Sequence, residues 1–155
     1  MLNLAERPLV AVCGAGACSR EVAALARKTG LLLAQNGAIL ICGGLGGVMA
    51  AAAQGAKEDG GLTIGILPGT DREAANPFID IPLATGLGHA RNAIIVRASQ
   101  AVIALPGEAG TLSEVALGLK MGRPVVGLAA WREIHGVLKA DSPDEAVRLV
   151  LSRVS

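Results

Sequence analysis

Arg91 and Glu114 are charged residues that stand beside glycine turns of a kind that binds anions. Glu114 ends the segment 105–114 (LPGEAGTLSE), in which an apolar run leads into a glycine turn and the start of a helix. Gly107 and Gly110 let the backbone turn with its N–H groups outward, where they could bind a phosphate. Because Arg91 lies 14 residues before this segment, we expect a cation and a carboxylate to flank one crevice.

Thr111 followed three residues later by Glu114 is the pattern of a capping box, in which the threonine caps the helix and the glutamate bonds back to the cap residue. This structural role is enough to explain Glu114. The positive end of the helix dipole also favours the ionised form, so we expect a carboxylate at neutral pH unless burial strongly opposes it. A fixed carboxylate stabilises positive charge, such as the oxocarbenium character that develops when an N-glycosidic bond breaks.

Two further glycine-rich loops are expected to follow buried strands. The loop 42–47 leads directly into an alanine-rich helix, so it either holds a phosphate at the helix N-terminus or forms a tight turn packed on small side chains. The loop 13–19 is a partial GxGxxG, and NAD is not expected because no acidic residue follows the second strand. The candidate phosphate-binding residues of these loops are Gly14, Gly16, Ser19, Gly43, Gly44, Gly46 and Gly47.

Two neighbours of these motifs have alternative roles. Asn92 contacts a polar edge of the ligand or caps its own helix. Glu108 adds a carboxylate that either crowds a ligand phosphate or faces solvent without effect. A phosphate and Glu114 would repel each other, so the phosphate is expected toward residues 43–47, with Arg91 offsetting its charge.

Three motifs occur in order along the chain: GGxGGxM at 43–49, TGxGxxRN at 85–92 and PGxxGTxxE at 106–114. In this order they resemble the LOG-like (SLOG) superfamily of Rossmann-type proteins, often misnamed lysine decarboxylases, and within it the molybdenum-cofactor-carrier-like branch. The resemblance implies a Rossmann-like fold and a nucleotide or a molybdenum-cofactor-like pterin as ligand. The cytokinin-activating phosphoribohydrolases of the superfamily carry lysine at the position of Asn92 and glycine at that of Glu108, which weighs against hydrolase activity.

Composition and length indicate one domain that spans residues 1–155. Hydrophobic residues make up 52% and the mean hydropathy is +0.52, which suits a parallel sheet covered on both faces and a further apolar surface between subunits. We therefore expect a homo-oligomer, either a dimer or a tetramer. With a net charge of +1, no basic run and only Phe78 and Trp131 as aromatics, a nucleic-acid partner is not expected.

The N-terminal residues show no signal-peptide pattern, so a cytoplasmic location is expected. The uncharged stretch 31–56 is long enough to cross a bilayer, but its glycines break it into strand, turn and helix, and no membrane association is expected. Cys13, Cys18 and Cys42 have no metal-binding spacing. We expect no metal site and interpret the cysteines as small buried residues, with contact between a thiol and the ligand as the alternative.

Apolar runs alternate with helical patterns, which predicts βαβ units. The predicted fold class is α/β: a Rossmann-like, doubly wound, mostly parallel sheet with helices on both faces and its loops lining one crevice. Pro82 places the strand that contains it at an edge or a strand end. Strands are predicted over 9–12, 38–41, 62–67, 79–84, 101–105 and 124–128, and helices over 20–35, 48–59, 92–99, 112–121 and 143–153.

The sequence thus favours a binding protein that holds a phosphate-bearing small molecule between the glycine loops and Arg91, with the ligand classes supplied by the family resemblance. The alternative is a nucleoside 5′-monophosphate phosphoribohydrolase that releases free base and ribose 5-phosphate. In that case Arg91 orients the substrate and Glu114 stabilises the transition state. Lysine decarboxylation is not expected, because neither Lys57 nor Lys120 lies on a motif that would hold pyridoxal phosphate.

Overall fold

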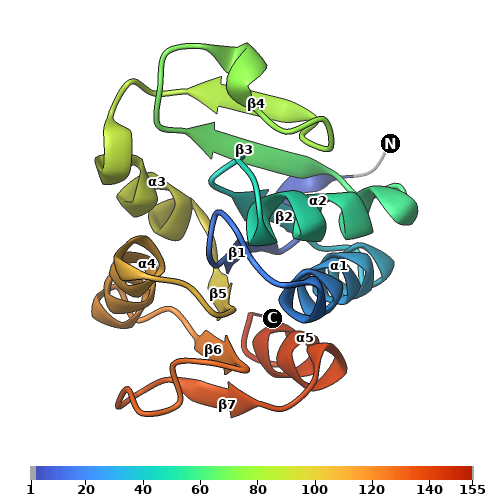
Figure 1. The fold of residues 1–155 in the computed structure, drawn as a ribbon. Helices are drawn as coiled ribbons and strands as arrows, with labels where there is room; N and C mark the ends of the chain where they lie inside the picture. The colour runs from blue at the N-terminus through green and yellow to red at the C-terminus, as the bar shows by residue number, and fades with distance from the viewer. Residues whose placement is uncertain (1–2, 155) are drawn as a thin grey trace.

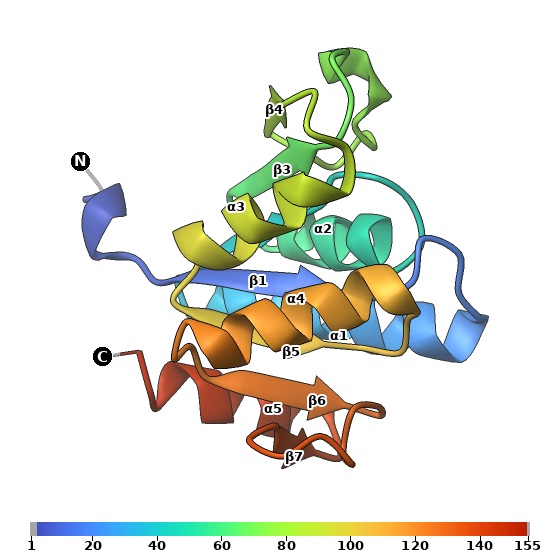
Figure 2. The ribbon, with the colours of Figure 1, turned by 90° about the vertical axis from the view of Figure 1, so that its left-hand side faces the viewer.

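The computed structural model describes residues 3–154 and arranges them as one seven-stranded parallel sheet with helices on both faces (Figure 1, Figure 2). The strands are β1 (Leu9–Cys13), β2 (Ile39–Cys42), β3 (Thr63–Leu67), β4 (Ile81–Ala84), β5 (Ala101–Ala104), β6 (Val125–Leu128) and β7 (Leu138–Ala140). The α-helices are α1 (Arg20–Gln35), α2 (Val48–Glu58), α3 (Arg91–Ala98), α4 (Ala109–Lys120) and α5 (Pro143–Leu151). Short 3-10 helices are η1 (Leu4–Glu6), η2 (Arg72–Ala74) and η3 (Gly88–Ala90).

The strand order is β4-β3-β2-β1-β5-β6-β7, and every strand pair is parallel. The chain therefore builds outward from β1 to β4, then crosses to the other side of β1 with β5. This is the doubly wound, Rossmann-like arrangement predicted from the sequence. β4, which contains Pro82, lies at an edge of the sheet, where a strand tolerates a missing N–H donor.

The helices form two layers around the sheet. α1, α2 and α5 cover one face, and α3 and α4 cover the other (Figure 1, Figure 2). Alternate side chains of β1 enter opposite layers, because Val10 and Val12 belong to the core under α1, α2 and α5, whereas Ala11 and Cys13 belong to the core under α3 and α4. A central strand buried on both faces is therefore apolar at successive positions.

Two glycines let α1 and α2 pack backbone to backbone. A Cβ atom on Gly30 would lie 1.9 Å from the carbonyl oxygen of Ala52, and one on Gly55 would lie 1.8 Å from that of Arg27. Any larger residue would push the two helices apart. This close contact holds α2 against α1, and it therefore also positions the glycine loop that precedes α2.

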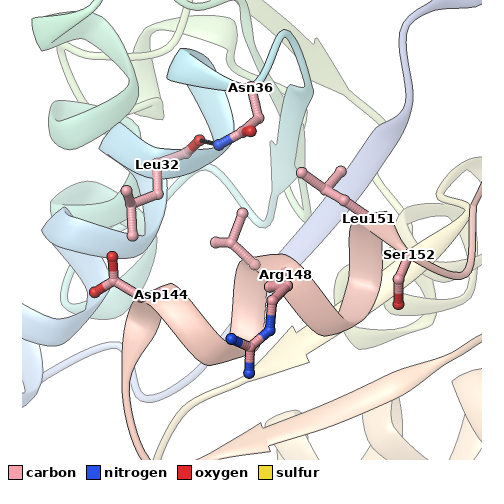
Figure 3. Close-up of a pocket in the computed structure, with 7 residues that line it drawn as sticks. Leu32, Asn36, Asp144, Arg148, Leu151 and Ser152 are labelled. Carbon is pink, nitrogen blue, oxygen red and sulfur yellow. Dashed lines mark hydrogen bonds between the residues drawn. The ribbon is translucent and has the colours of Figure 1, made fainter.

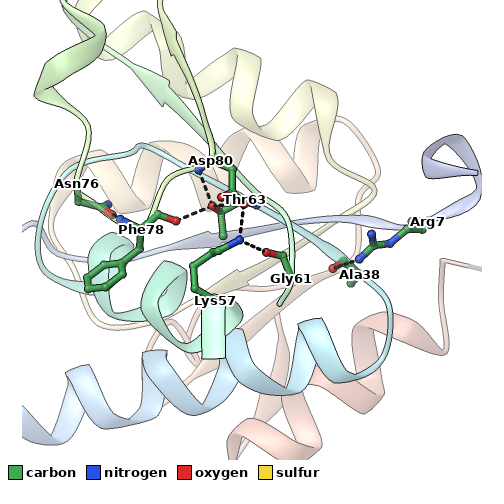
Figure 4. Close-up of polar contacts among 8 residues, drawn as sticks. All are labelled: Arg7, Ala38, Lys57, Gly61, Thr63, Asn76, Phe78 and Asp80. Carbon is green, nitrogen blue, oxygen red and sulfur yellow. Dashed lines mark hydrogen bonds and ion pairs between the residues drawn. The ribbon is translucent and has the colours of Figure 1, made fainter. Parts of the chain in front are cut away.

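A polar cluster joins the beginning of β4 to β3 and α2 (Figure 4). The Asp80 carboxylate accepts hydrogen bonds from Lys57 Nζ at 2.8 Å, from Thr63 N at 3.0 Å and from Thr63 Oγ1 at 3.2 Å. Burial opposes ionisation of Asp80, but these hydrogen bonds and the Lys57 charge outweigh it, so the pKa of Asp80 lies below its ordinary value. The cluster therefore anchors the edge strand.

Apart from the short 3-10 helices, the predicted bounds lie within two residues of the observed ones except at two elements. β7, a three-residue strand at the edge beyond β6, was not predicted. α4 begins at Ala109, three residues earlier than predicted, with Glu108 at its N-cap position. Among residues 3–154, no helix is both long enough and apolar enough to cross a membrane.

Candidate functional site

A cavity of about 240 Å³ lies where β1 and β5 end, beside the point at which the strand order reverses. Doubly wound sheets bind ligands there because the loops that follow the two strands diverge and leave a crevice. The cavity wall comes from the loop after β1, the first turn of α2, η3, the start of α3 and the N-terminal half of α4. The lining residues are Gly14, Gly16, Met49, His89, Arg91, Glu108, Gly110, Thr111 and Glu114.

Arg91, the first residue of α3, is 7% exposed and is held by backbone carbonyls. Its Nε donates to the Ile66 oxygen at 2.8 Å, its Nη2 donates to the Gly43 oxygen at 3.5 Å, and its Nη1 donates to Asn92 Oδ1. Burial lowers the pKa of Arg91, and the negative charge of Glu114 opposes this effect, so the guanidinium stays charged. Arg91 thus links β3 and the loop after β2 to α3. Only the remaining N–H groups of its guanidinium are available to a ligand.

Glu114 does not belong to a capping box, which corrects the sequence prediction. Because α4 begins at Ala109, Thr111 lies inside the first turn and Glu114 lies beyond it. Glu114 is 8% exposed and lines the cavity. Burial raises the pKa of Glu114 to about 7, and the nearby Arg91 lowers it only in part. Glu114 therefore loses its proton near neutral pH and not in acid as an ordinary glutamate does.

Two helices that begin at the cavity wall, α2 and α4, lack a side-chain cap. By contrast, α1 and α5 are capped by Ser19 and Ser142, whose hydroxyls accept hydrogen bonds from the backbone N–H groups of Val22 and Glu145. Within residues 3–154, the N–H groups of residues 109–111 have no acceptor. Free N–H groups at the positive end of a helix form an anion site. Ser19, a predicted phosphate contact, caps α1 and is not among the residues that line the cavity.

The structure brings some of the predicted site residues to the cavity and leaves others beside it. The loop 43–47 packs against the loop after β1, since a Cβ atom on Gly47 would lie 2.2 Å from the Ala15 oxygen and one on Gly46 would lie 3.1 Å from the Gly16 oxygen. The sequence left open a turn packed on small side chains, whereas these two glycines meet the backbone of residues 15 and 16. The predicted residues that line the cavity are Gly14, Gly16, Arg91, Gly110, Thr111 and Glu114.

Three other predicted glycines shape the wall without lining it. A Cβ atom on Gly43 would lie 2.7 Å from Arg91 Nη2, and one on Gly107 would lie 2.1 Å from Thr111 Oγ1. Gly44 is buried with a φ of +77°, a conformation that favours glycine. The glycines at 43 and 107 therefore leave room for the side chains that do reach the cavity.

Asn92 is not among the residues that line the cavity, and it joins α3 to α4. It is 2% exposed, and its Nδ2 donates to Ser113 Oγ at 3.0 Å and to the Gly110 oxygen at 3.4 Å, while its Oδ1 accepts from Arg91. Asn92 therefore does not cap its own helix. It aligns Arg91 with the first turn of α4.

Cys13 and Cys42 are buried at the ends of β1 and β2. Burial raises the pKa of both thiols, to about 12 for Cys42, where a hydrogen bond from Gly44 N only partly opposes it. Neutral buried thiols are poor nucleophiles, as expected for structural cysteines. In the part of the chain that the structure describes, no three His, Cys, Asp or Glu residues are grouped so as to hold a metal ion.

A sequence model of the SLOG cluster4 family matches residues 7–153. The chain belongs to the SLOG cluster4 family. This membership confirms the LOG-like superfamily that the three motifs indicated.

Relatives of this SLOG cluster4 protein include two of known structure. The molybdenum cofactor binding protein from the phototrophic bacterium Rippkaea orientalis superposes with a TM-score of 0.93 at 39% identity, covering 97% of this chain and 99% of that one. The molybdenum cofactor carrier protein from Chlamydomonas reinhardtii gives a TM-score of 0.87 at 35% identity, covering 95% and 98%. A Mycobacterium tuberculosis protein named cytokinin riboside 5′-monophosphate phosphoribohydrolase is 33% identical over 135 residues, which are 81% of this chain and 72% of the relative.

Met49 and His89 line the cavity although the sequence did not single them out as ligand contacts. Both lie inside the family motifs, at the end of 43–49 and within 85–92, and that position was the signal that could have found them. Glu108 also lines the cavity, and its residue is exposed to solvent.

Four other hollows on residues 3–154 are larger than this cavity. One of about 400 Å³ lies between α1 and α5 (Figure 3), lined by Leu32, Asn36, Asp144, Val147, Arg148, Leu151 and Ser152. Another of about 660 Å³ is mostly apolar and lies on the α3 and α4 side, lined by Ala93, Ile94, Arg97, Ala98 and Met121. None of the four combines glycine loops, a free helix N-terminus and a buried arginine and glutamate, so the smaller cavity is the candidate site.

Proposed function

We propose that this SLOG cluster4 protein binds a phosphate-bearing small molecule in the cavity at the start of α2 and α4. The observation that carries the proposal is the uncapped start of α4, where the N–H groups of residues 109–111 border the cavity that also holds Arg91. A phosphate would accept hydrogen bonds from these groups, and Arg91 and the helix dipole would offset its charge. Gly14 and Gly16 allow the backbone to approach the ligand closely.

The proposed ligand is a nucleotide or a molybdenum-cofactor-like pterin. Two similar structures are named for binding or carrying the molybdenum cofactor. The cavity of about 240 Å³ is smaller than the roughly 300–1,000 Å³ of pockets that enclose drug-sized ligands. The cavity would therefore enclose the phosphate and the adjoining group, and the rest of the ligand would extend outward.

A phosphoribohydrolase acting on nucleoside 5′-monophosphates is the second candidate, and Glu114 is the observation that favours it. A carboxyl group with a pKa of about 7 is available at neutral pH both to protonate a leaving base and to stabilise positive charge. Two residues weigh against this role. Asn92 replaces the family lysine and is committed to Ser113 and Gly110, and Glu108 adds a carboxylate where the enzymes have glycine.

Release of ribose 5-phosphate from a panel of nucleoside monophosphates, measured for the wild type and for Glu114→Gln, separates the two candidates. A binding protein gives no multiple turnover, and native mass spectrometry detects retained ligand in both proteins. Multiple turnovers that Glu114→Gln abolishes would establish the hydrolase instead. If neither turnover nor retained ligand is found, both candidates are refuted.

A homo-oligomer, a dimer or tetramer, is also part of the proposal. Leu87, Ile94 and Leu112 are 51%, 38% and 44% exposed, on the side of the molecule that η3, α3 and α4 form. Apolar side chains gathered on one face favour burial against a second copy. Light scattering should report an oligomer that Ile94→Asp dissociates. The control is Leu4→Asp, because Leu4 is 50% exposed on η1, outside the surface that η3, α3 and α4 form.

A further inference from the structure

Glu114 is a largely buried residue whose carboxyl group opens into the cavity and has no protein partner. Its residue is 8% exposed, and within residues 3–154 no donor forms a hydrogen bond or ion pair with it. Arg91 lowers the pKa of Glu114 through its charge, but its three hydrogen bonds go to Ile66, Gly43 and Asn92. Arg123 Nε is the buried side-chain atom without a partner within residues 3–154, so the Glu114 oxygens are open to the cavity, where a ligand would replace the water around them.

The charge around Glu114 decides in which form it meets a ligand. The charged and titratable groups around it are Arg91, His89 and Glu108, which line the cavity, and the buried thiols of Cys13 and Cys42, whereas α2 contributes only Met49. Burial raises the pKa of both thiols, so the thiols carry no charge at neutral pH. The positive charge of Arg91 attracts an anion into the cavity, whereas the negative charge of Glu108 at the start of α4 repels one. The surplus positive charge is too small to hold an ionised Glu114 and a phosphate together.

We propose that Glu114 takes up a proton when the phosphate-bearing ligand binds and then donates its carboxyl O–H to an acceptor oxygen of that ligand. The proton comes from solvent and bonds to one carboxylate oxygen, and no bond of the ligand breaks. A phosphate group carries about −1.5 to −2 charge at pH 7, so it repels an ionised carboxylate in the same small cavity. Protonation replaces this repulsion with a hydrogen bond. The inference rests on the proposed function, because it needs an anionic ligand in this cavity.

Glu114 then sets which ligands the cavity accepts and at which pH. A ligand with an acceptor oxygen at this position is favoured over one with only donors there, because the protonated carboxyl group has a hydrogen to give. Since the free carboxyl group has a pKa of about 7, the site is already protonated near pH 6 but must gain a proton on binding above pH 7. Affinity for phosphate-bearing ligands therefore falls as pH rises.

Calorimetric titration of the wild type and of Glu114→Gln with AMP, GMP, ribose 5-phosphate and inorganic phosphate tests the inference. Glutamine is nearly isosteric and stays neutral, so it imitates the protonated form. Phosphate itself titrates near pH 6, and the ratio of the two dissociation constants at each pH cancels that contribution. We expect the wild-type Kd to rise on the order of tenfold relative to the variant between about pH 6 and 8.5.

Proton uptake is measured directly by repeating the titration near pH 7 in buffers of different ionisation enthalpy. The wild type should take up to about half a proton more per site than Glu114→Gln, because roughly half of the free carboxyl groups are ionised there. The control is Glu6→Gln, which changes an exposed carboxylate on η1, outside the residues that line the cavity, and should keep the wild-type pH dependence. The ¹³C resonance of the Glu114 carboxyl group should report a pKa that rises when the ligand is added.

The outcomes separate this inference from the proposed function. The inference is overturned if the ratio of the wild-type Kd to the Glu114→Gln Kd does not change with pH, or if the pKa of Glu114 falls in the complex. Either result leaves the binding function in place. Failure of all four probes to bind overturns both.

Discussion

Arg91 and Glu114 line one cavity, but no contact of 4 Å or less joins their charged groups in the structure of residues 3–154. Arg91 is turned toward the carbonyl groups of Ile66 and Gly43 instead. Each residue still acts on the other at longer range, since Arg91 lowers the pKa of Glu114 and Glu114 raises that of Arg91. The site thus keeps a fixed cation and a titratable acid without letting them neutralise each other.

Replacing Arg91 by lysine keeps the charge but removes the planar fork that reaches Ile66 and Gly43. We expect the free energy of unfolding to fall by about 2–4 kcal/mol and ligand affinity to fall at least about tenfold. Denaturant unfolding and ligand titration measure the two effects. Arg97→Lys, on the exposed side of the same helix, is the control, and equal losses in both variants would contradict the role given to Arg91.

Stability should depend on pH through Glu114. Its pKa is raised from 4.5 to about 7, chiefly because burial disfavours the charge. A carboxyl group whose pKa is raised by folding contributes stability that is fully present below about pH 4.5 and is lost as the pH rises to about 7. Over this range the wild type should lose on the order of 3 kcal/mol relative to Glu114→Gln. Urea unfolding of both proteins at several pH values measures the difference, and a pH-independent difference would contradict the assignment.

Gly43→Ala should disturb Arg91 without adding or removing a polar group. The new Cβ atom would lie 2.7 Å from Arg91 Nη2 and 2.7 Å from Met49 Sδ, so both side chains must shift. We expect a loss of stability of about 1–3 kcal/mol and weaker ligand binding. At Gly69 a Cβ atom meets nothing within 4 Å, so Gly69→Ala should leave both quantities unchanged. Equal behaviour of the two variants would show that Gly43 has no special role.

Much of the fold could be predicted because its central strands are buried on both faces and are therefore apolar at every position, as in Val10 to Val12. β7 escaped prediction because it has three residues and Lys139 at its centre is exposed. So short an edge strand is recognised only through its pairing with β6. The start of α4 was placed too late, because Thr111 and Glu114 match a capping box that the fold does not use.

The candidate site was predictable only in part. The motif spacing predicted that Arg91 and Glu114 share a crevice with glycine turns, and both line the cavity. Sequence could not predict the partners of Arg91, because Ile66 and Gly43 lie 25 and 48 residues away along the chain. The protonation state of Glu114 follows from burial by these distant segments, which no local pattern encodes.

Asp80→Asn should loosen the edge strand β4. The carboxylate accepts hydrogen bonds from Lys57 and Thr63, and they lower its pKa below the ordinary value despite burial. The contribution to stability is therefore present above about pH 4 and is lost as the pH falls through the lowered pKa. We expect a loss of about 1–2 kcal/mol at neutral pH that shrinks in acid. Asp59→Asn, at the exposed end of α2, is the control.

Ala129→Gly should stabilise the protein. Ala129 and Trp131 have φ values of 61° and 63°, in the left-handed region that costs a non-glycine residue about 1–2 kcal/mol. The strained loop places Trp131 so that its Nε1 donates to the Leu105 oxygen at 2.9 Å. We expect a gain of about 1 kcal/mol in denaturant unfolding for Ala129→Gly. Ala130→Gly, at a position without a positive φ, should instead be neutral or destabilising.

The position of β1 has a consequence for how the chain is made. β1 is the first strand of the sheet along the chain, but one of its two neighbours is β5, and Val10 pairs with Ala101. Until β5 emerges from the ribosome, one edge of β1 presents unpaired N–H and C=O groups to other chains. The cavity needs the segment that follows β5, since Thr111 of α4 lines it together with Gly14. A growing chain therefore covers the free edge of β1 and completes its ligand site only after about two thirds of its residues have been made.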